Sequence, residues 1–235
     1  MSTKYKRIIL KLSGEALAGS DRFGIDFEKM QPIVKAIEKC HKSGTQIGIV
    51  IGGGNFWRGR SNGNMDRVKA DHMGMLATVI NALGLSDALE RIGVESQILT
   101  AIPFPQIGKP YSPVRAIKSL EKGKIVIFGY GTGNAFFSTD TAASLRAAEI
   151  SADAILKATN IDGVYDSDPE TNPDAKKYDE VTFDEVLAKN LKVMDASSIS
   201  MCRDNKIDVL VFSVKNPENL VLAVSGENPG TFAHA

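Results

Sequence analysis

The stretch RIILKL, residues 7–12, is the segment on which the fold depends. It is apolar apart from Arg7 and Lys11 and is flanked by polar residues, a pattern typical of a strand buried on both faces of a parallel sheet. Similar short runs recur along the chain. They predict strands at residues 46–51, 96–101, 124–128, 154–157 and 209–213.

Segments with the apolar period of a helix separate these strands. They predict helices at residues 26–43, 66–91, 114–120, 139–150, 183–188, 196–205 and 217–224. Thr139 or Asp140 is expected to cap the fourth of them, and Gly74 and Gly84 are expected to interrupt the second. Alternating strands and helices predict an α/β protein, a three-layer αβα sandwich around one mostly parallel sheet.

Composition narrows the function classes. The chain has 235 residues, which fits one compact domain over residues 1–235, and 28 basic residues balance 28 acidic ones. This balance excludes a broad basic field for nucleic acid, so an anion site must be local. The two cysteines and three histidines are unclustered, which disfavours a zinc site and a Ser-His-Asp hydrolase. With no apolar signal core or membrane-length stretch, we expect a cytoplasmic protein.

Three loops after predicted strands are rich in glycine and polar residues: residues 11–15, 52–55 and 129–134. Ligands of open α/β sheets bind at the carboxyl ends of the strands, where these loops meet. Glycine permits positive φ, which lets successive N–H groups converge on phosphate oxygens. One such turn is usually only a tight connection, but three together predict a nucleotide site. None matches the P-loop or the dinucleotide GxGxxG pattern.

Two lysines lie inside or at the end of apolar strands. Lys11 and Lys157 are costly to bury unless each ammonium group meets an anion, the alternative being a side chain that reaches solvent. With Arg58 after the triple glycine, they would supply the positive charge that phosphoryl transfer requires.

At this point the motifs support a resemblance. The segments Lys11-Leu12-Ser13-Gly14-Glu15, Val50-Ile51-Gly52-Gly53-Gly54-Asn55, Asp71-His72-Met73-Gly74-Met75, Thr132-Gly133-Asn134 and Lys157-Ala158-Thr159 resemble bacterial UMP kinases of the amino-acid-kinase superfamily. The similarity runs from about residue 5 to residue 231. It implies a carbamate-kinase-like αβα fold with an eight-stranded, largely parallel sheet, and a homohexamer. It also implies transfer of the ATP γ-phosphoryl group to UMP with Mg²⁺, in pyrimidine nucleotide biosynthesis, with UTP as inhibitor and GTP as candidate activator.

The resemblance also implies site residues. The catalytic set is Lys11, Arg58, Asp140, Lys157 and Asp195. The ATP set is Lys11, Leu12, Ser13, Gly14, Gly54, Arg58, Thr159, Tyr165 and Asp168. The UMP set is Gly53, Asp71, Thr132, Gly133, Asn134, Ala135, Phe136, Phe137, Ser138 and Thr139. The candidate GTP effector set is Gly19, Ser20, Asp21, Arg22, Phe23 and Gly24.

Several of these residues also have simpler interpretations. Asp140 and Asp195 would orient the lysines or would cap helices, and Asp71 would be a solvated helical charge near Arg67. The chain departs from the family where some enterobacterial members contact GTP with basic residues, since Ser86, Glu90 and Gln97 stand there.

A phosphate monoester is mostly dianionic at neutral pH, so the acceptor needs no general base. Mg²⁺ would bind mainly through nucleotide phosphates and water. Two alternatives remain: a superfamily kinase acting on a carboxylate such as acetylglutamate, aspartate or carbamate, and a non-catalytic nucleotide or oxyanion binder.

Overall fold

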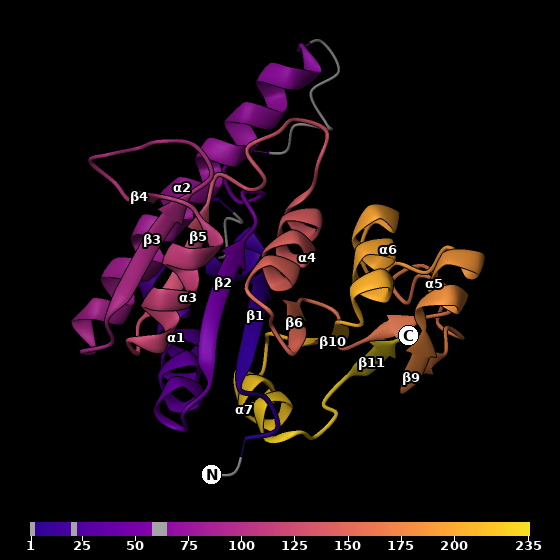
Figure 1. Cartoon of the computed structure of the whole chain (residues 1–235). Coiled ribbons are helices and arrows are strands. Elements are labelled where there is room, and N and C mark those ends of the chain that lie inside the picture. The colour runs from indigo at the N-terminus through magenta and orange to yellow at the C-terminus, as the bar shows by residue number, and fades with distance from the viewer. Residues whose placement is uncertain (1–2, 20–22, 58–64) are drawn as a thin grey trace.

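The structure is a computed structural model that describes residues 3–19, 23–57 and 65–235 (Figure 1). The strands of its main sheet are β1 (Arg7–Leu12), β2 (Gln46–Ile51), β3 (Ser96–Thr100), β4 (Lys109–Pro110), β5 (Ile125–Gly129), β6 (Ala154–Thr159), β9 (Glu180–Thr182), β10 (Asp208–Ser213) and β11 (Thr231–His234). The helices are the 3-10 turn η1 (Gly14–Leu17), α1 (Phe27–Lys42), α2 (Arg67–Arg91), α3 (Pro113–Glu121), α4 (Thr139–Glu149), α5 (Phe183–Lys189), α6 (Ala196–Asn205) and α7 (Glu218–Ser225).

The strand order in the main sheet is β4-β3-β5-β2-β1-β6-β10-β11-β9. Strands β4 through β10 in this order run parallel, and only the β10–β11 pair is antiparallel. The predicted largely parallel α/β fold is therefore confirmed. The described sheet has nine strands rather than eight, and its two edge strands, β4 and β9, have only two and three residues. A separate hairpin pairs β7 (Val164–Tyr165) with β8 (Lys177–Tyr178).

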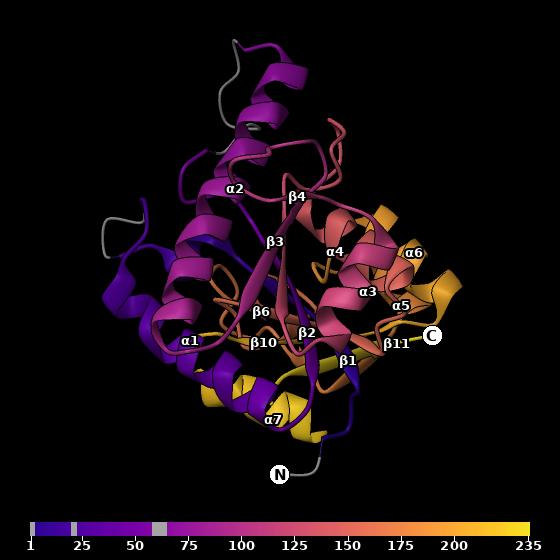
Figure 2. The ribbon, with the colours of Figure 1, turned by 60° about the vertical axis from the view of Figure 1, so that its left-hand side comes forward.

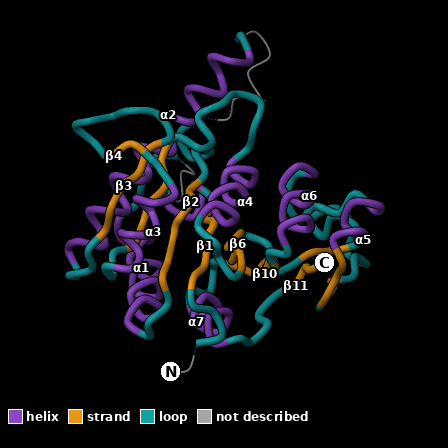
Figure 3. The backbone as a smooth tube through the Cα atoms, in the orientation of Figure 1, coloured by secondary structure: helices purple, strands orange, loops and turns teal. Residues whose placement is uncertain are grey.

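Helices cover both faces of the sheet. Side chains of α1, α2 and α7 form one apolar core cluster with the sheet, and side chains of α3, α4, α5 and α6 form the other. Figure 2 shows α1, α2 and α7 on one side of the strands and the remaining helices on the other, and Figure 3 shows the strands running between the two helical layers. No helix within the described ranges has both the length and the apolar character to cross a bilayer.

The alternation of side chains along β1 determines where Lys11 points. Ile8, Leu10 and Leu12 belong to the α1/α2/α7 cluster, whereas Ile9 belongs to the cluster under α4. Because successive strand residues face opposite sides, Lys11 lies on the same face as Ile9. Lys157 stands in the same relation to Ile155 of β6. Both lysines therefore face the layer that contains α4.

Two predictions about helices were wrong. Helix α2 is continuous through Gly74 and Gly84. Gly84 lies against Ile25, since a Cβ at this position would lie 2.6 Å from Cδ1 of that side chain. Helix α4 is capped by Ser138, whose hydroxyl accepts hydrogen bonds from the N–H groups of Asp140 and Thr141. Asp140 is thereby free to use its carboxylate elsewhere.

Candidate active site

A lysine–aspartate–lysine cluster lies where β1 and β6 end. The two strands pair in register with Lys11 opposite Lys157, so both ammonium groups emerge side by side. Asp140, in the first turn of α4, bridges them: Oδ1 lies 2.8 Å from Nζ of Lys11, and Oδ2 lies 2.9 Å from Nζ of Lys157. Lys157 also donates to the Val193 carbonyl at 2.6 Å. The cluster carries a net charge of one positive, which suits an anionic ligand.

Electrostatics in this cluster favour the charged form of Asp140. Burial by itself would raise the pKa of Asp140, but the ammonium groups of Lys11 and Lys157 outweigh burial and lower this pKa from 3.8 to about 2. Burial lowers the pKa of Lys157, and the Asp140 carboxylate opposes that shift. The side chains of the three residues are between 12% and 17% exposed, so water screens their interaction only weakly.

Asp195 ties the start of α4 to α6 rather than contacting a lysine. It is the N-cap of α6 and accepts the Ser198 N–H at 2.9 Å through Oδ1. Its Oδ2 accepts the hydroxyl of Ser138 and, at 3.0 Å, that of Thr141. Burial raises the pKa of Asp195, but these hydrogen bonds more than offset burial, so the net shift is downward. The capping interpretation of Asp195 is thus realised, and the same carboxylate holds the helix that positions Asp140.

Three cavities lie in a row beside this cluster. The central cavity, about 430 Å³, is lined by Asp140, Lys157 and Asp195 together with Arg67, Asp71, Phe137, Ser138, Lys192, Val193 and Met194. The α2 cavity, about 130 Å³, shares Asp71, Phe137 and Ser138 with the central one. The loop cavity, about 230 Å³, shares Lys192 with it. The shared residues show that the central cavity adjoins the other two.

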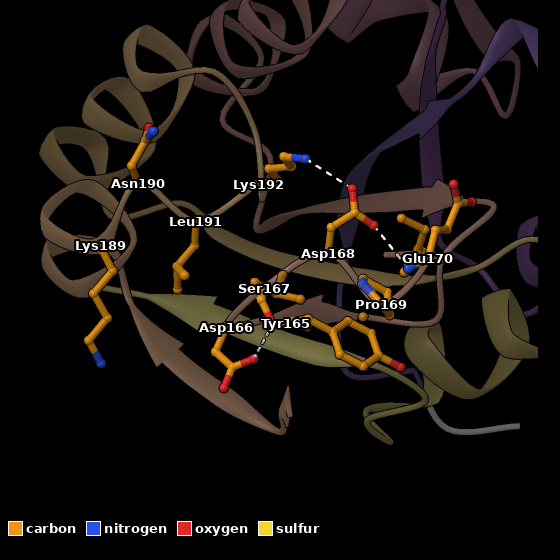
Figure 4. Close-up of a pocket in the computed structure, with 13 residues that line it drawn as sticks. Tyr165, Asp166, Ser167, Asp168, Pro169, Glu170, Lys189, Asn190, Leu191 and Lys192 are labelled. Carbon is orange, nitrogen blue, oxygen red and sulfur yellow. Dashed lines mark hydrogen bonds and ion pairs between the residues drawn. The ribbon is translucent and has the colours of Figure 1, made fainter. Parts of the chain in front are cut away.

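The loop cavity is lined by residues that follow β6 and by residues 189–192, which precede α6 (Figure 4). Tyr165 and Asp168, two residues of the candidate ATP set, both line it. Asp168 accepts the Glu170 N–H at 3.0 Å and forms an ion pair with Lys192 at 3.3 Å. Apolar side chains such as Leu191 line it as well, so the cavity has both apolar and charged lining residues.

The α2 cavity is lined by Gly53, Asp71, Thr132, Phe137, Ser138 and Thr139 from the predicted UMP set, with Trp57, Ala70, Gly74, Met75, Thr78 and Gly131. Asp71 forms an ion pair with Arg67 at 2.8 Å. It also accepts the Phe136 N–H at 2.8 Å, which docks the loop after β5 onto α2. Asp71 is therefore a helical charge near Arg67, but its side chain is only 15% exposed and borders two cavities, so the interpretation as a solvated charge does not account for it.

The glycine loops differ from the conformation expected of them. Positive φ occurs in the loop after β5, at Gly131 (56°) and Gly133 (83°). Gly14 and Gly53 do not have positive φ and are needed for close packing instead. A Cβ on Gly14 would lie 2.5 Å from the Gly52 carbonyl oxygen, and one on Gly53 would lie 2.5 Å from the Gly74 carbonyl oxygen.

Other predicted residues are not among those that line the three cavities, or they lie outside the described ranges. Arg58 and the effector residues Ser20, Asp21 and Arg22 are outside the described residues. The linings do not include Lys11, Leu12, Ser13, Gly14, Gly54, Gly133, Asn134, Ala135, Phe136 or Thr159. Ser13 caps η1 by accepting the Glu15 N–H, and Leu12 is buried in the core.

Sequence reasoning missed a buried network that supports the loop after β5. The guanidinium of Arg146 donates to the Gly131 carbonyl at 3.3 Å and to Glu149 at 2.6 Å, and it stacks on the Tyr111 ring at 3.8 Å. Arg146 is only 4% exposed. An arginine within the apolar segment AASLRAAE was the available signal, since an arginine is rarely buried unless it is paired.

The fold and the cation cluster define a class of protein, the αβα phosphotransferases. Residues 6–213 match the Amino acid kinase family. A UMP kinase from Bacillus anthracis is 38% identical, with a TM-score of 0.94 over 98% of this chain and 96% of that one. A UMP kinase from Ureaplasma parvum is 41% identical, with a TM-score of 0.93 over 99% and 100%. The uridylate kinase of Archaeoglobus fulgidus is 28% identical, with a TM-score of 0.73 over 96% and 99%. The chain belongs to the amino acid kinase family, in its bacterial UMP kinase branch.

Proposed function

We propose that this chain is a uridylate kinase that transfers the γ-phosphoryl group of ATP to UMP, giving ADP and UDP, in pyrimidine nucleotide biosynthesis. The observation that carries the proposal is the Lys11–Asp140–Lys157 cluster beside the central cavity. The full-length similarity to proteins named UMP kinases supports UMP as the acceptor. Residues 1–235 are proposed to act as a single amino-acid-kinase domain.

The order of the cavities supports an assignment of substrates. ATP would lie with its base in the loop cavity, near Tyr165 and Asp168, and UMP would lie in the α2 cavity, near Asp71 and Thr132. Their phosphates would then meet in the central cavity. A UMP phosphate oxygen attacks the γ-phosphorus, and the bond from that phosphorus to the oxygen bridging the β- and γ-phosphates breaks as ADP leaves.

Lys157 and Lys11 would stabilise the charge on the transferring group, and Asp140 would hold both ammonium groups in place. The acceptor phosphate is already ionised, so the mechanism needs no general base. Arg58 and the remaining residues of the predicted ATP and UMP sets would align the two nucleotides.

The proposal includes Mg²⁺ held mainly by nucleotide phosphates and water. Both oxygens of Asp140 are ion-paired to lysines, and the described residues contain no group of three or more His, Cys, Asp or Glu side chains arranged for a metal. A cation that keeps its waters and binds through phosphates fits such a donor set. When bound, it would neutralise charge on the β- and γ-phosphates.

A coupled assay for ADP formation tests the function. UMP, CMP, AMP, acetylglutamate and aspartate are offered in turn with ATP, and the expected result is turnover with UMP. Absence of turnover with UMP rejects the proposal. Turnover with a carboxylate would favour the carboxylate-kinase alternative, and binding of nucleotides without any turnover would favour the non-catalytic binder.

Self-association is part of the proposal, as a homohexamer. Met73, Leu76, Ile80 and Leu83 are exposed on α2 and recur at the a/d spacing of a helix–helix seam. An apolar stripe of this kind on a long helix supports a symmetric contact with the same helix of a second copy. Such dimers would be the units of the hexamer.

Regulation and location are the remaining parts of the proposal. UTP is proposed as an inhibitor, and GTP remains a candidate activator. Ser86, Glu90 and Gln97 carry no positive charge, so they offer no cation to the phosphates of GTP. The Ser86 hydroxyl instead donates a hydrogen bond to Glu90 at 3.2 Å. Adding GTP and UTP separately to the UMP assay tests both effects. A cytoplasmic location, where both substrates occur, completes the proposal.

A further inference from the structure

A reciprocal pair of side-chain amides lies beneath the glycine loops. Asn55 follows the triple glycine after β2 and is 1% exposed, and Asn81 lies in the middle of α2 and is fully buried. Nδ2 of Asn55 donates to Oδ1 of Asn81 at 2.9 Å, and Nδ2 of Asn81 donates to Oδ1 of Asn55 at 2.8 Å. The two buried amides are therefore joined by a pair of hydrogen bonds, and neither side chain is charged.

The second N–H of each amide holds a backbone carbonyl. Asn81 donates to the Gly52 carbonyl at 2.8 Å, and Asn55 donates to the Gly24 carbonyl at 2.7 Å. The Gly24 N–H returns a hydrogen bond to the Asn55 carbonyl at 3.0 Å. All four amide N–H bonds are therefore used within the protein, and neither side chain has a donor left for a phosphate.

The pair also contacts the loop after β1. A Cβ on Gly14 would lie 2.4 Å from Oδ1 of Asn55, so the two are already in close contact. The segment that contains Gly24 is held at one further point: the rings of Phe23 and Phe56 meet edge to face with centroids 5.6 Å apart. Three separate stretches of chain thus converge on one amide pair.

We propose that Asn55 and Asn81 are positioning residues, which join the loops after β1 and β2 and the segment at residues 23–26 into one rigid unit attached to α2. The inference rests on the proposed function, in which Gly14 and Gly54 of those loops border ATP, Gly53 borders UMP, and α2 carries Asp71. The pair would act through the Gly52 carbonyl and the backbone at Gly14 rather than by touching a substrate. Its loss would let the loops move relative to Lys11.

Steady-state kinetics of Asn55→Ala, Asn81→Ala and the double variant test the proposal. We expect kcat/KM for ATP to fall about 10- to 100-fold, because small displacements of aligned groups are costly. KM for UMP should change less than KM for ATP, because Gly53 is the one residue of 11–15 and 52–55 that lines the α2 cavity. The double variant should be no worse than the worse single variant. Thr45→Val is the matched control, since Thr45 is buried and its hydroxyl donates to the Tyr5 carbonyl away from the cleft.

Amide hydrogen exchange gives a readout that needs no activity. Exchange in the Asn81→Ala variant should accelerate at residues 13–18 and 23–26 and remain unchanged at residues 200–205, which belong to α6. If Asn81→Ala does not fold, Asn81→Ser, which keeps one donor, is measured in the same way. Two results overturn the proposal. One is a lower yield of active enzyme whose KM for ATP equals that of wild type, and the other is an unchanged exchange rate at residues 23–26. A wild-type enzyme inactive on UMP rejects the proposed function instead, and the exchange result still stands.

Discussion

Replacing Asp140 with asparagine removes the one carboxylate that bridges Lys11 and Lys157. The shape of the side chain is nearly unchanged, so the variant isolates the effect of charge. Two partly buried ammonium groups would then face each other without a counterion. Breaking a buried ion pair by removing one partner usually costs about 3–5 kcal/mol of stability.

The pKa of Asp140 provides a separate measure of the same interaction. Its fall from 3.8 to about 2 corresponds to about 2–3 kcal/mol at about 1.4 kcal/mol per unit. Since the pKa is lowered in the folded state, this stabilisation is present in full above about pH 4 and is lost as the pH falls toward 2. The free energy of unfolding of Asp140→Asn should lack the part of the pH dependence that comes from protonation of Asp140.

Urea unfolding between pH 7 and pH 2, at one protein concentration, measures both effects. Wild type should lose more stability between pH 4 and pH 2 than Asp140→Asn does. At pH 7 the variant should also show a kcat at least about 100-fold lower, because its lysines are no longer held in place.

Asp153→Asn is the control for this experiment. Asp153 accepts the N–H groups of Lys6 and Arg7 at the other end of β1, away from the lysine cluster. Its replacement should leave kcat within about twofold of wild type. An Asp140→Asn variant with wild-type stability at pH 7 and an unchanged acid profile would refute the reasoning.

Four further variants test other parts of the structure. Lys11→Ala should abolish turnover while UMP binding stays measurable by calorimetry, and equal loss of both would contradict its role. Ile80→Asp should lower the mass measured by light scattering, because it places charge in the exposed apolar stripe of α2, and an unchanged mass would exclude that stripe as a contact. Arg146→Met should raise KM for UMP about tenfold, since the loop carbonyl that Arg146 holds loses its donor, and an unchanged KM would make the network purely structural. Gly53→Ala should cost about 1–3 kcal/mol in urea unfolding because its Cβ would overlap α2, whereas Gly52→Ala, with its nearest contact at 3.3 Å, should cost less. Equal costs would argue against the packing interpretation.

Much of the fold could be predicted from the sequence because the signals are local. Strands β1 and β2 and helix α6 begin and end at the predicted residues, since turn residues bound each of them. The short strands β4, β7, β8, β9 and β11 were not predicted, because two to four residues carry no readable period. Their existence depends on neighbouring strands that only the folded chain provides.

The sequence by itself determined an αβα protein with two strand-end lysines and three glycine loops. Only the tertiary structure decided that Asp140 lies between those lysines, that Gly14 and Gly53 serve packing, and that Asn81 supports the loops. The physical reason is the distance in sequence over which each interaction acts. The periods of strands and helices are set by residues that are close neighbours in the chain. An ion pair or an amide pair between distant residues depends on strand register and helix docking, and no local pattern records these.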